Sequence, residues 1–508
     1  MEEVPDLVKA EAFPITVQPP PFFRDHHVQD RPVFPAVEAM EQLAADTCGR
    51  FPETDGRRLS DLRFDRFLHL DEPTPVAAFN RVGKNDDGSM HAVLTTRIQS
   101  KKTGIGRSLE HASLTVGQAR PMDKTLSLDV AASLVGICTA VEPERIYADM
   151  VPFGPAYRNI RSDLLLSANG ALARVGSPQP PDPRGDLYLG SPYVLDAAFH
   201  VACVWCQRYL DNVAFPVSID QRTVFRPTRL EAVYTARIVP VRTDKEPFVF
   251  DIFIYDDEAG LCESAIGVGM HDVSGGRTRP PRGFFEPTGT DPLRSLSGRV
   301  AGLVLLERKA VAPFAPAALS EREKKRLEPM TEQRAGAYLS ARLALKRLSR
   351  MFGNSGDRRD ARQIETVAED GRRPMCPRPD GGRAFCSVAH DRRFTLAAAA
   401  ETPLGVDVEP LREQPLAATH LYLDTEELHR IGQSALSPAR AALQAWSAKE
   451  AAAKALGIDL AETWKRVRVC LLSEEESRLE IDDGRSLTAI HATVEGHLFT
   501  LLTEGETP

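Results

Sequence analysis

The chain contains 508 residues, of which 42% are hydrophobic and 26% charged, a composition typical of soluble globular proteins. This length exceeds what one compact core supports, so two or three domains are expected. A net charge of −8 argues against a general nucleic-acid-binding surface, and no run of about eighteen apolar residues predicts a membrane span. An acidic start without an apolar core predicts no secretory signal, and eight cysteines among apolar neighbours predict reduced thiols in the cytoplasm.

The first part of the chain, residues 1–275, is predicted to be an α+β region. Stretches rich in β-branched and aromatic residues predict strands at 92–97, 171–175, 232–239 and 248–255. Apolar helices are predicted at 36–44 and 194–210, each of them after a loop that contains proline. Because each half of the region offers one such helix among strands, we predict a duplicated unit.

The remaining chain is predicted to form a second domain. A Gly-, Pro-, Arg- and Ser-rich stretch at 276–297 has the composition of a linker, and the second domain follows at 298–508. Ser320 and Glu323 have the spacing of a capping box and predict the start of a polar helix. A longer helix is predicted at about 332–351.

Two histidines and an aspartate are the candidate catalytic residues of the first region. His26 precedes an apolar helix and could act as a general base, with a structural or solvent-facing role as the alternative. Asp196 and His200 are spaced i, i+4 and share a helix face, where a buried carboxylate needs a polar partner. The alternative for Asp196 is an interaction with the helix dipole. A metal site of His200, Cys203 and Cys206 is disfavoured because the three spread over too wide an arc of one helix.

Together these fragments resemble the dehydratase domain of polyketide and fatty acid synthases, which has a double-hotdog fold. That family shows His-x3-Gly-x4-Pro, Tyr-Gly-Pro-x-Phe and Asp-x3-Gln/His. The counterparts occur here in the same order, at 26–35, 153–157 and 196–200. The resemblance covers about 15–275 and implies that His26 removes the α-proton of a 3-hydroxyacyl thioester. It also implies that Asp196 protonates the departing hydroxyl and that His200 orients Asp196.

One position departs from the dehydratase pattern. Asp30 occupies the place of the motif glycine. Aspartate tolerates a left-handed backbone better than most residues, so the turn can persist. His27 is an alternative base, although the spacing to Pro35 favours His26. A non-catalytic module that only recruits a carrier protein is the alternative to a dehydratase, and Asp30 would be its mark.

Three carboxylates and two lysines form the candidate site of the second domain. A short apolar strand carries Asp407 and Glu409, whose i, i+2 spacing places both side chains on one face. About forty residues further on, an Ala-rich helix carries Lys449, Glu450 and Lys454. The alanines alone favour the helix, so the charges point to function. Carboxylates that hold a divalent cation, with lysines beside phosphates, would suit a phosphorylated ligand.

Residues 300–505 resemble the surfactin-type 4′-phosphopantetheinyl transferases. That family shows Gly-Lys/Arg-Pro-x-x-Pro, Ser-x-Ser-His, Gly-Ile/Val-Asp-x-Glu and Trp-x-x-Lys-Glu-x-x-x-Lys. The counterparts occur in order at 371–377, 387–390, 405–409 and 446–454, with the first glycine one residue further upstream. The implied fold is a pseudo-twofold pair of α/β halves, about 300–400 and 401–505, with the site at their junction.

The resemblance implies a role for each charged residue of the last two motifs. Asp407, Glu409 and Glu450 would bind Mg²⁺ together with the pyrophosphate of coenzyme A, and Lys449 and Lys454 would contact phosphates. A carrier-protein serine would attack the β-phosphate and release 3′,5′-ADP. Glu450 would act as the base, directly or through water.

The two upstream motifs imply contacts at the other end of coenzyme A. Arg373 and His390 would hold the adenosine 3′-phosphate, and Arg342 is a weaker candidate for this contact. Ala389 stands at the second serine of the Ser-x-Ser-His segment, so a hydroxyl contact to coenzyme A is expected to be lost.

The two resemblances imply a bifunctional protein of polyketide or fatty acid biosynthesis. The second domain would install phosphopantetheine on an acyl carrier protein, and the first would dehydrate 3-hydroxyacyl chains carried on such an arm. One alternative keeps the transferase beside a non-catalytic docking module, and another gives the second domain a different phosphorylated ligand. Neither nucleic acid nor a membrane is expected as a partner, and dehydratase domains of this kind often form homodimers.

Overall fold

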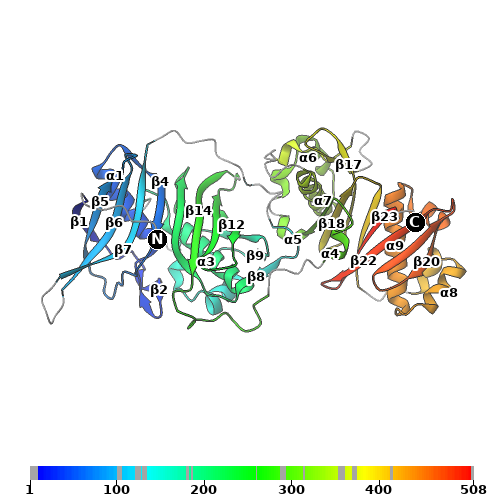
Figure 1. Ribbon diagram of the computed structural model, residues 1–508, viewed down its shortest axis with the longest axis horizontal. Coiled ribbons are helices and arrows are strands. Elements are labelled where there is room, and N and C mark those ends of the chain that lie inside the picture. The colour runs from blue at the N-terminus through cyan, green and yellow to red at the C-terminus, as the bar shows by residue number, and fades with distance from the viewer. Residues whose placement is uncertain are drawn as a thin grey trace. The chain divides into compact units, whose positions relative to one another are not determined.

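A computed structural model divides the chain into two compact units (Figure 1). Unit 1 comprises Met1–Leu128 and Thr139–Thr288, and unit 2 comprises Asp129–Cys138 and Gly289–Pro508. The structure describes residues 10–99, 106–119, 128, 134–178, 182–184, 187–258, 260–286, 293–312, 315–352, 361–368, 374–411 and 416–504. No helix in these residues is long and apolar enough to cross a membrane. The domain boundaries taken from composition stay predictions.

Unit 1 is built on one antiparallel sheet, in which twelve described strands are hydrogen-bonded side by side. In sheet order the strands are β1 (Glu11–Val17), β5 (Val76–Lys84), β6 (Met90–Gln99), β7 (Gly106–Gln118), β4 (Thr54–Arg63), β11 (Phe215–Val224), β14 (Leu261–His271), β13 (Phe248–Tyr255), β12 (Tyr234–Arg242), β10 (Gly170–Val175), β9 (Leu164–Ser167) and β8 (Thr139–Val141). The pairing of β4 with β11 joins a first half, β1 to β7, to a second half that begins at β8.

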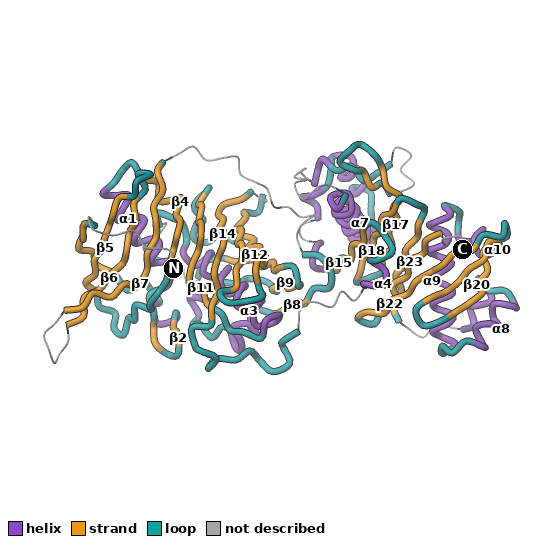
Figure 2. Tube along the Cα trace, in the orientation of Figure 1, coloured by secondary structure: helices purple, strands orange, loops and turns teal. Residues whose placement is uncertain are grey.

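Each half of unit 1 wraps its strands around one long helix, as Figure 2 shows. Helix α1 (Ala36–Arg50) packs against β4 to β7, and α3 (Pro192–Leu210) packs against β10 to β13. The apolar character of α3 has a physical reason, because nearly all of its side chains are buried in the core of unit 1. The predicted duplicated unit, a double hotdog, is confirmed.

Short elements of unit 1 carry the motif loops. They are η1 (Phe23–Asp25), β2 (His27–Val28), β3 (Arg31–Pro32), α2 (Pro143–Arg145), η3 (Ile146–Met150) and η4 (Pro155–Tyr157). Gln29 and Asp30 form the tight turn between β2 and β3, with φ of 50° and 61°. Two successive residues with positive φ are what a two-residue hairpin of type I′ requires. Asp30 therefore adopts the left-handed conformation that the motif glycine would supply.

Unit 2 contains two antiparallel sheets, each covered by one long helix. The first sheet has the order β15 (Gly302–Glu307), β18 (Phe394–Ala400), β17 (Arg383–His390) and β16 (Cys376–Pro377). The second has the order β19 (Leu404–Pro410), β23 (His497–Glu504), β22 (Ser486–Val494), β21 (Glu476–Ile481) and β20 (Val467–Leu472). Helix α7 (Glu332–Met351) packs on the first sheet and α9 (Pro438–Leu456) on the second. This is the predicted pair of α/β halves.

Shorter helices complete unit 2. They are α4 (Arg294–Ser297), α5 (Arg308–Val311), η5 (Ala315–Ala318), α6 (Glu321–Leu327), η6 (Ala361–Gln363), η7 (Leu416–Leu421), α8 (Thr425–Gln433) and α10 (Leu460–Arg466). The predicted capping box is present at the start of α6, where Ser320 and Glu323 each accept a hydrogen bond from the other's backbone N–H. Helix α8 begins with a second capping box, formed by Asp424 and Glu427.

The two sheets of unit 2 meet where β17 lies beside β19, and the backbone N–H of Val406 donates to Ser387 Oγ (3.1 Å). Gly405 lets β19 approach α9 very closely, since a Cβ atom at this position would lie 1.8 Å from the carbonyl oxygen of Ala451. The alanines of α9 therefore do more than favour a helix, because their small side chains allow this close packing. The approach brings Asp407 on β19 next to Glu450 on α9.

Candidate active sites

Unit 1 contains a cavity of about 880 Å³ whose lining includes His26, Asp196 and His200. His26 lies on the segment before α1, about 170 positions from Asp196 and His200, which both lie on α3. Apolar side chains such as Phe34, Phe153 and Phe199 form much of the remaining wall. An apolar wall beside His26, Asp196 and His200 suits a ligand that has an apolar portion next to its reacting group.

Asp196 lies between the two histidines. His26 Nε2 is 3.6 Å from Asp196 Oδ1, and His200 Nε2 is 3.1 Å from Asp196 Oδ2. The second contact is close but not aligned as a hydrogen bond. All three side chains are at least 89% buried. Burial raises the pKa of Asp196, but its close polar contacts with His200 and His26 outweigh burial and hold that pKa well below its ordinary value.

Neighbouring groups define the proton positions on both imidazoles. His26 Nδ1 lies 3.3 Å from the carbonyl oxygen of Val33, which can only accept, so in the neutral imidazole Nε2 carries the lone pair, on the side of Asp196. Tyr147 Oη accepts from the backbone N–H of Ile160 (3.0 Å) and lies 3.4 Å from His200 Nδ1. The Tyr147 hydroxyl can therefore donate to Nδ1, which leaves the proton of His200 on Nε2, beside Asp196.

A loop from the second half positions His26. The carbonyl oxygen of Asp25 accepts from the N–H of Gly154 (2.8 Å), and its carboxylate accepts from the N–H of Ala156 (2.9 Å). A Cβ atom at Gly154 would lie 2.4 Å from Asp25 Cγ, so this contact requires glycine. The Phe153 ring packs against His26, at a centroid distance of 4.7 Å. Sequence reasoning identified this loop as a motif but missed the roles of Asp25 and Tyr147, because both act through tertiary contacts.

Unit 2 contains a larger cleft, of about 1160 Å³, between its two halves. The described candidate residues that line it are Asp407, Glu409, Glu450, Lys454, His390 and Arg342. Residues of α7, the end of β17, β19 and α9 all contribute to the wall. Arg373 lies outside the described residues. The structure therefore brings the residues of three predicted motifs into one cleft.

The carboxylates of the cleft are held by side chains from α9. Asp407 Oδ1 accepts from Lys454 Nζ (3.0 Å), and Oδ2 accepts from Ser447 Oγ (2.8 Å). Glu409 Oε1 accepts from the indole N–H of Trp446 (2.9 Å), the first residue of the helix motif. Lys454 Nζ also lies 3.7 Å from Glu450 Oε2. The family motif thus contains residues that orient the carboxylates as well as those that carry charge.

The cleft carries an excess of negative charge at this end. Burial, followed by the charge of Asp407, raises the pKa of Glu409 and raises that of Glu450 to about 7. Among the described residues, these three carboxylates share one neighbouring cation, Lys454, which contacts Asp407 and Glu450. Oxygen donors and this charge fit Mg²⁺. No three such side chains of the described residues are already gathered around one point, so a cation would have to draw them together.

Lys449 corrects one expectation from the sequence. Its side chain is completely buried, and Nζ contacts Glu427 Oε1 (2.8 Å) and the carbonyl oxygen of Tyr422 (2.8 Å). It does not line the cleft. Lys449 and Lys454 are five residues apart, which is about 140° around a helix, so they face different ways. The predicted contact between Lys449 and a phosphate is wrong, whereas Lys454 does face the cleft.

Two basic side chains, His390 and Arg342, also line the cleft. Partial burial and the charges of Arg308 and Lys454 lower the pKa of His390, and burial lowers the pKa of Arg342. Each shift shows that the group lies in surroundings that disfavour further positive charge. A bound anion would stabilise positive charge on both groups, which agrees with the phosphate contacts predicted for His390 and Arg342.

Comparison with known proteins matches a different family model to part of each unit. Residues 138–280 match the family described as polyketide synthase dehydratase N-terminal domain, and residues 403–502 match the 4′-phosphopantetheinyl transferase superfamily. A curated relative is a polyunsaturated fatty acid synthase polypeptide of Thraustochytrium sp., 26% identical over 217 residues. The match covers 41% of this chain and spans only 7% of that relative.

Several solved structures with detectable similarity are dehydratase domains. One is the dehydratase domain from the CurF module of curacin polyketide synthase, with 17% identity, a TM-score of 0.43 and coverage of 53% of this chain and 96% of that chain. Another is a trans-AT polyketide synthase dehydratase domain from Brevibacillus brevis, with 16% identity, a TM-score of 0.42 and coverage of 51% and 94%. Residues 138–280 are therefore similar to polyketide-synthase-type dehydratases and residues 403–502 to 4′-phosphopantetheinyl transferases, which supports the fusion that the sequence predicts.

Proposed function

We propose that unit 2 transfers 4′-phosphopantetheine from coenzyme A to a serine of an acyl carrier protein, with Mg²⁺, and that unit 1 dehydrates 3-hydroxyacyl chains on such an arm. The observation that carries the transferase proposal is the cleft itself. It joins a carboxylate-rich end that fits Mg²⁺ to Arg342 and His390, whose surroundings favour an anion.

In the transfer, the serine hydroxyl attacks the β-phosphorus of coenzyme A. A phosphoester bond forms, the bond to the bridging oxygen breaks, and 3′,5′-ADP leaves. Glu450 takes the serine proton, directly or through water, and Lys454 neutralises charge on the pyrophosphate. Asp407, Glu409 and Glu450 would hold the Mg²⁺, which when bound neutralises charge on the transferring phosphoryl group.

In the dehydration, Nε2 of His26 takes the α-proton of the thioester. The bond from C3 to the hydroxyl oxygen breaks as Asp196 donates its proton to that oxygen. Water departs, and a double bond remains between C2 and C3. His26 is then charged and Asp196 ionised, and the depressed pKa of Asp196 makes its protonated form a strong acid toward the hydroxyl oxygen. A proton that passes from His26 to Asp196, 3.6 Å away, restores both groups.

The transferase proposal is tested by incubating the full chain with coenzyme A, Mg²⁺ and each of a panel of apo carrier proteins, then measuring intact carrier mass. We expect a gain of one phosphopantetheine group with the parent and a strong loss of rate in Glu450→Gln. Glu426→Gln, which removes a carboxylate of an exposed ion pair on α8, is the matched control and should react like the parent. No mass gain with any carrier would refute the proposal.

The dehydratase proposal is tested with 3-hydroxyacyl pantetheine thioesters and the full chain. His26→Ala and Asp196→Asn should each abolish water loss, whereas Tyr147→Phe should reduce it because His200 loses its hydroxyl neighbour. Unchanged dehydration in His26→Ala would refute the catalytic role of His26. No dehydration by the parent chain would favour the non-catalytic docking module instead. His27→Ala, which alters the neighbouring histidine, distinguishes the two candidate bases.

A further inference from the structure

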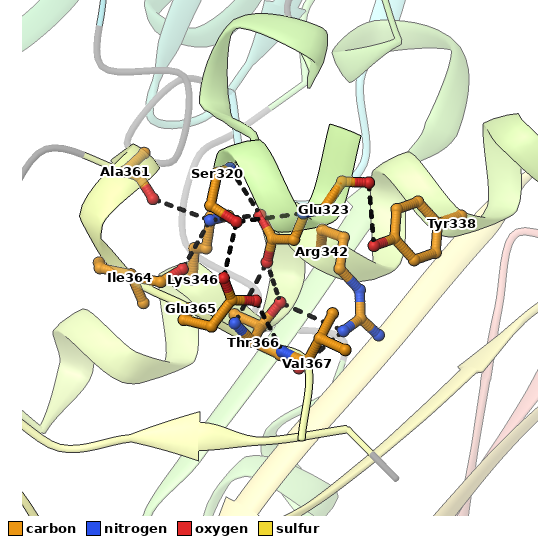
Figure 3. A network of polar contacts seen from close by, with 10 residues as sticks. All are labelled: Ser320, Glu323, Tyr338, Arg342, Lys346, Ala361, Ile364, Glu365, Thr366 and Val367. Atoms are coloured by element: carbon orange, nitrogen blue, oxygen red, sulfur yellow. Dashed lines mark hydrogen bonds and ion pairs between the residues drawn. The ribbon is translucent and has the colours of Figure 1, made fainter. Parts of the chain in front are cut away.

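A buried polar network lies beneath the Arg342 side of the cleft (Figure 3). Its centre is Glu323, whose side chain is completely buried. Oε2 accepts from the N–H of Ser320 (3.0 Å) and from Lys346 Nζ (2.7 Å). Oε1 accepts from the N–H (3.1 Å) and the hydroxyl (2.6 Å) of Thr366. Four donors use the full acceptor capacity of a carboxylate, so Glu323 is completely satisfied inside the protein.

Lys346 is equally well satisfied. Its ammonium group, which is also completely buried, donates to the carbonyl oxygens of Ala361 (2.8 Å) and Ile364 (2.6 Å) in addition to Glu323. The three donors of the ammonium group therefore have three acceptors. Because Lys346 neutralises Glu323, the carboxylate does not cancel the charge of a nearby cation. A second cation can therefore be hydrogen-bonded to the network and still keep its positive charge available for a ligand.

That second cation is Arg342. Its Nη1 donates to the carbonyl oxygen (2.7 Å) and lies 3.2 Å from the hydroxyl oxygen of Thr366. Because the Thr366 hydroxyl donates to Glu323, its lone pair faces Arg342, and a direct relay runs from Glu323 through Thr366 to the guanidinium. The Tyr338 ring supports the guanidinium from one side, at 5.1 Å. Within the described residues Arg342 forms no ion pair, and its buried Nε has no hydrogen-bond partner.

The other half of unit 2 supplies an internal comparison. In that half, Glu427 corresponds to Glu323. Glu427 accepts a hydrogen bond from the backbone N–H of Val469 (2.8 Å), as Glu323 does from the backbone N–H of Thr366. Valine has no hydroxyl, so this half has no relay. A buried Lys–Glu pair therefore does not require a hydroxyl at this position, and what the Thr366 hydroxyl adds in the first half is its contact with Arg342.

We infer that Glu323, acting through the Thr366 hydroxyl, is a positioning residue that aims the Arg342 guanidinium at a phosphate monoester of the ligand; this rests on the proposed use of coenzyme A. An arginine held at Nη1 keeps its other N–H groups for phosphate oxygens in a fixed orientation. On coenzyme A the phosphate monoester is the 3′-phosphate. Glu323 and Thr366 would thereby select coenzyme A over its 3′-dephospho form.

The test uses isothermal titration calorimetry on the full chain at constant Mg²⁺, with coenzyme A and with 3′-dephospho-coenzyme A. Thr366→Val should raise the Kd for coenzyme A about tenfold, the effect of one hydrogen bond to a charged group, and that for the dephospho form less than about twofold. Thr366→Ser, which retains the hydroxyl, should restore most of the affinity. Equal losses for both ligands, or no loss for coenzyme A, would overturn the inference.

A double-mutant cycle separates this role from a structural one. If Thr366 acts through Arg342, then Arg342→Ala and Arg342→Ala/Thr366→Val should bind coenzyme A with the same Kd. Additive losses would overturn the inference while leaving the proposed function intact. A parent protein that binds neither ligand would instead refute the proposed function, and the inference with it. Thr366 is varied rather than Glu323, because Glu323→Gln would leave Lys346 buried without a counter-charge.

Discussion

The two halves of unit 2 contain the same kind of buried ion pair. In each, a short helix begins with a capping box, and its glutamate pairs with a lysine on the long helix that follows. The pair is Glu323 with Lys346 in the first half and Glu427 with Lys449 in the second. The separation is 23 residues in one half and 22 in the other. Because both halves contain the pair, the role that the two pairs share is to stabilise the fold. A role in the cleft is additional to that shared role.

The halves differ in what surrounds that ion pair. Thr366 in the first half connects the glutamate to Arg342, which lines the cleft. At the matching position the second half has Val469, whose carbonyl oxygen accepts from Arg430, and that arginine pairs with Glu426 away from the cleft. Under the proposed function, the first half has adapted a structural pair to ligand binding, whereas the second half has kept the pair structural.

The largest effect is expected from breaking the pairs. Lys346→Met and Lys449→Met should each lower the free energy of unfolding by about 3–5 kcal/mol, because each leaves a buried glutamate without its counter-charge. Urea denaturation of both variants tests this. If Lys449→Met kept the stability of the parent but no longer bound coenzyme A, the phosphate contact predicted for Lys449 from the sequence would be supported instead. Exposed Lys324→Met, on α6, is the matched control.

A second contrast concerns the glycines where a strand meets the long helix. Gly405→Ala should destabilise the second half by about 3 kcal/mol, since its Cβ would lie 1.8 Å from a backbone carbonyl oxygen. In the first half, the Cβ of Gly302→Ala would lie 3.1 Å from the end of the Leu348 side chain, which can move. Thermal unfolding should show a clear loss for Gly405→Ala and a small one for Gly302→Ala. Equal losses would contradict the close approach of β19 to α9.

Acid should affect the second half through His491. This side chain is almost completely buried between the hydroxyls of Ser477 (2.7 Å) and Thr500 (2.9 Å), and burial lowers its pKa to about 3. Below an unfolded pKa of about 6.5, the unfolded chain binds a proton that the folded chain does not, so stability falls as the pH falls. Between pH 7 and pH 5 the loss should be about 2 kcal/mol.

The measurement for His491 is urea denaturation followed by tryptophan fluorescence, since Trp446 and Trp464 both belong to this half. The comparison is the change in stability between pH 7 and pH 5, in the parent and in His491→Asn. The variant should lack the part of the pH dependence that His491 causes, whether or not its stability at pH 7 differs from that of the parent. An unchanged pH dependence would mean that His491 can be protonated in the folded protein.

Much of this architecture could be predicted from the sequence, and the exceptions have a common cause. The capping box at Ser320 was predicted because its residues are local, but the pairing of Glu323 with Lys346 was not, because it joins distant segments. The motif that contains Lys449 and Lys454 groups them by spacing, yet helix geometry turns only Lys454 toward the cleft. In unit 1 the motifs led to His26 and Asp196, whereas the contact of Tyr147 with His200 depends on a fold that no local pattern encodes.

The smallest effect is expected where the halves are made alike. Val469→Thr places a hydroxyl beside Glu427, as Thr366 does beside Glu323, so the free energy of unfolding should change by less than about 1 kcal/mol. The Kd for coenzyme A should stay within about twofold of the parent, because Arg430 is paired with Glu426 and does not line the cleft. Calorimetry on this variant beside Thr366→Val tests whether the hydroxyl matters only where an arginine faces the ligand. Equal effects of the two substitutions on coenzyme A binding would show that the two halves do not differ in the way proposed.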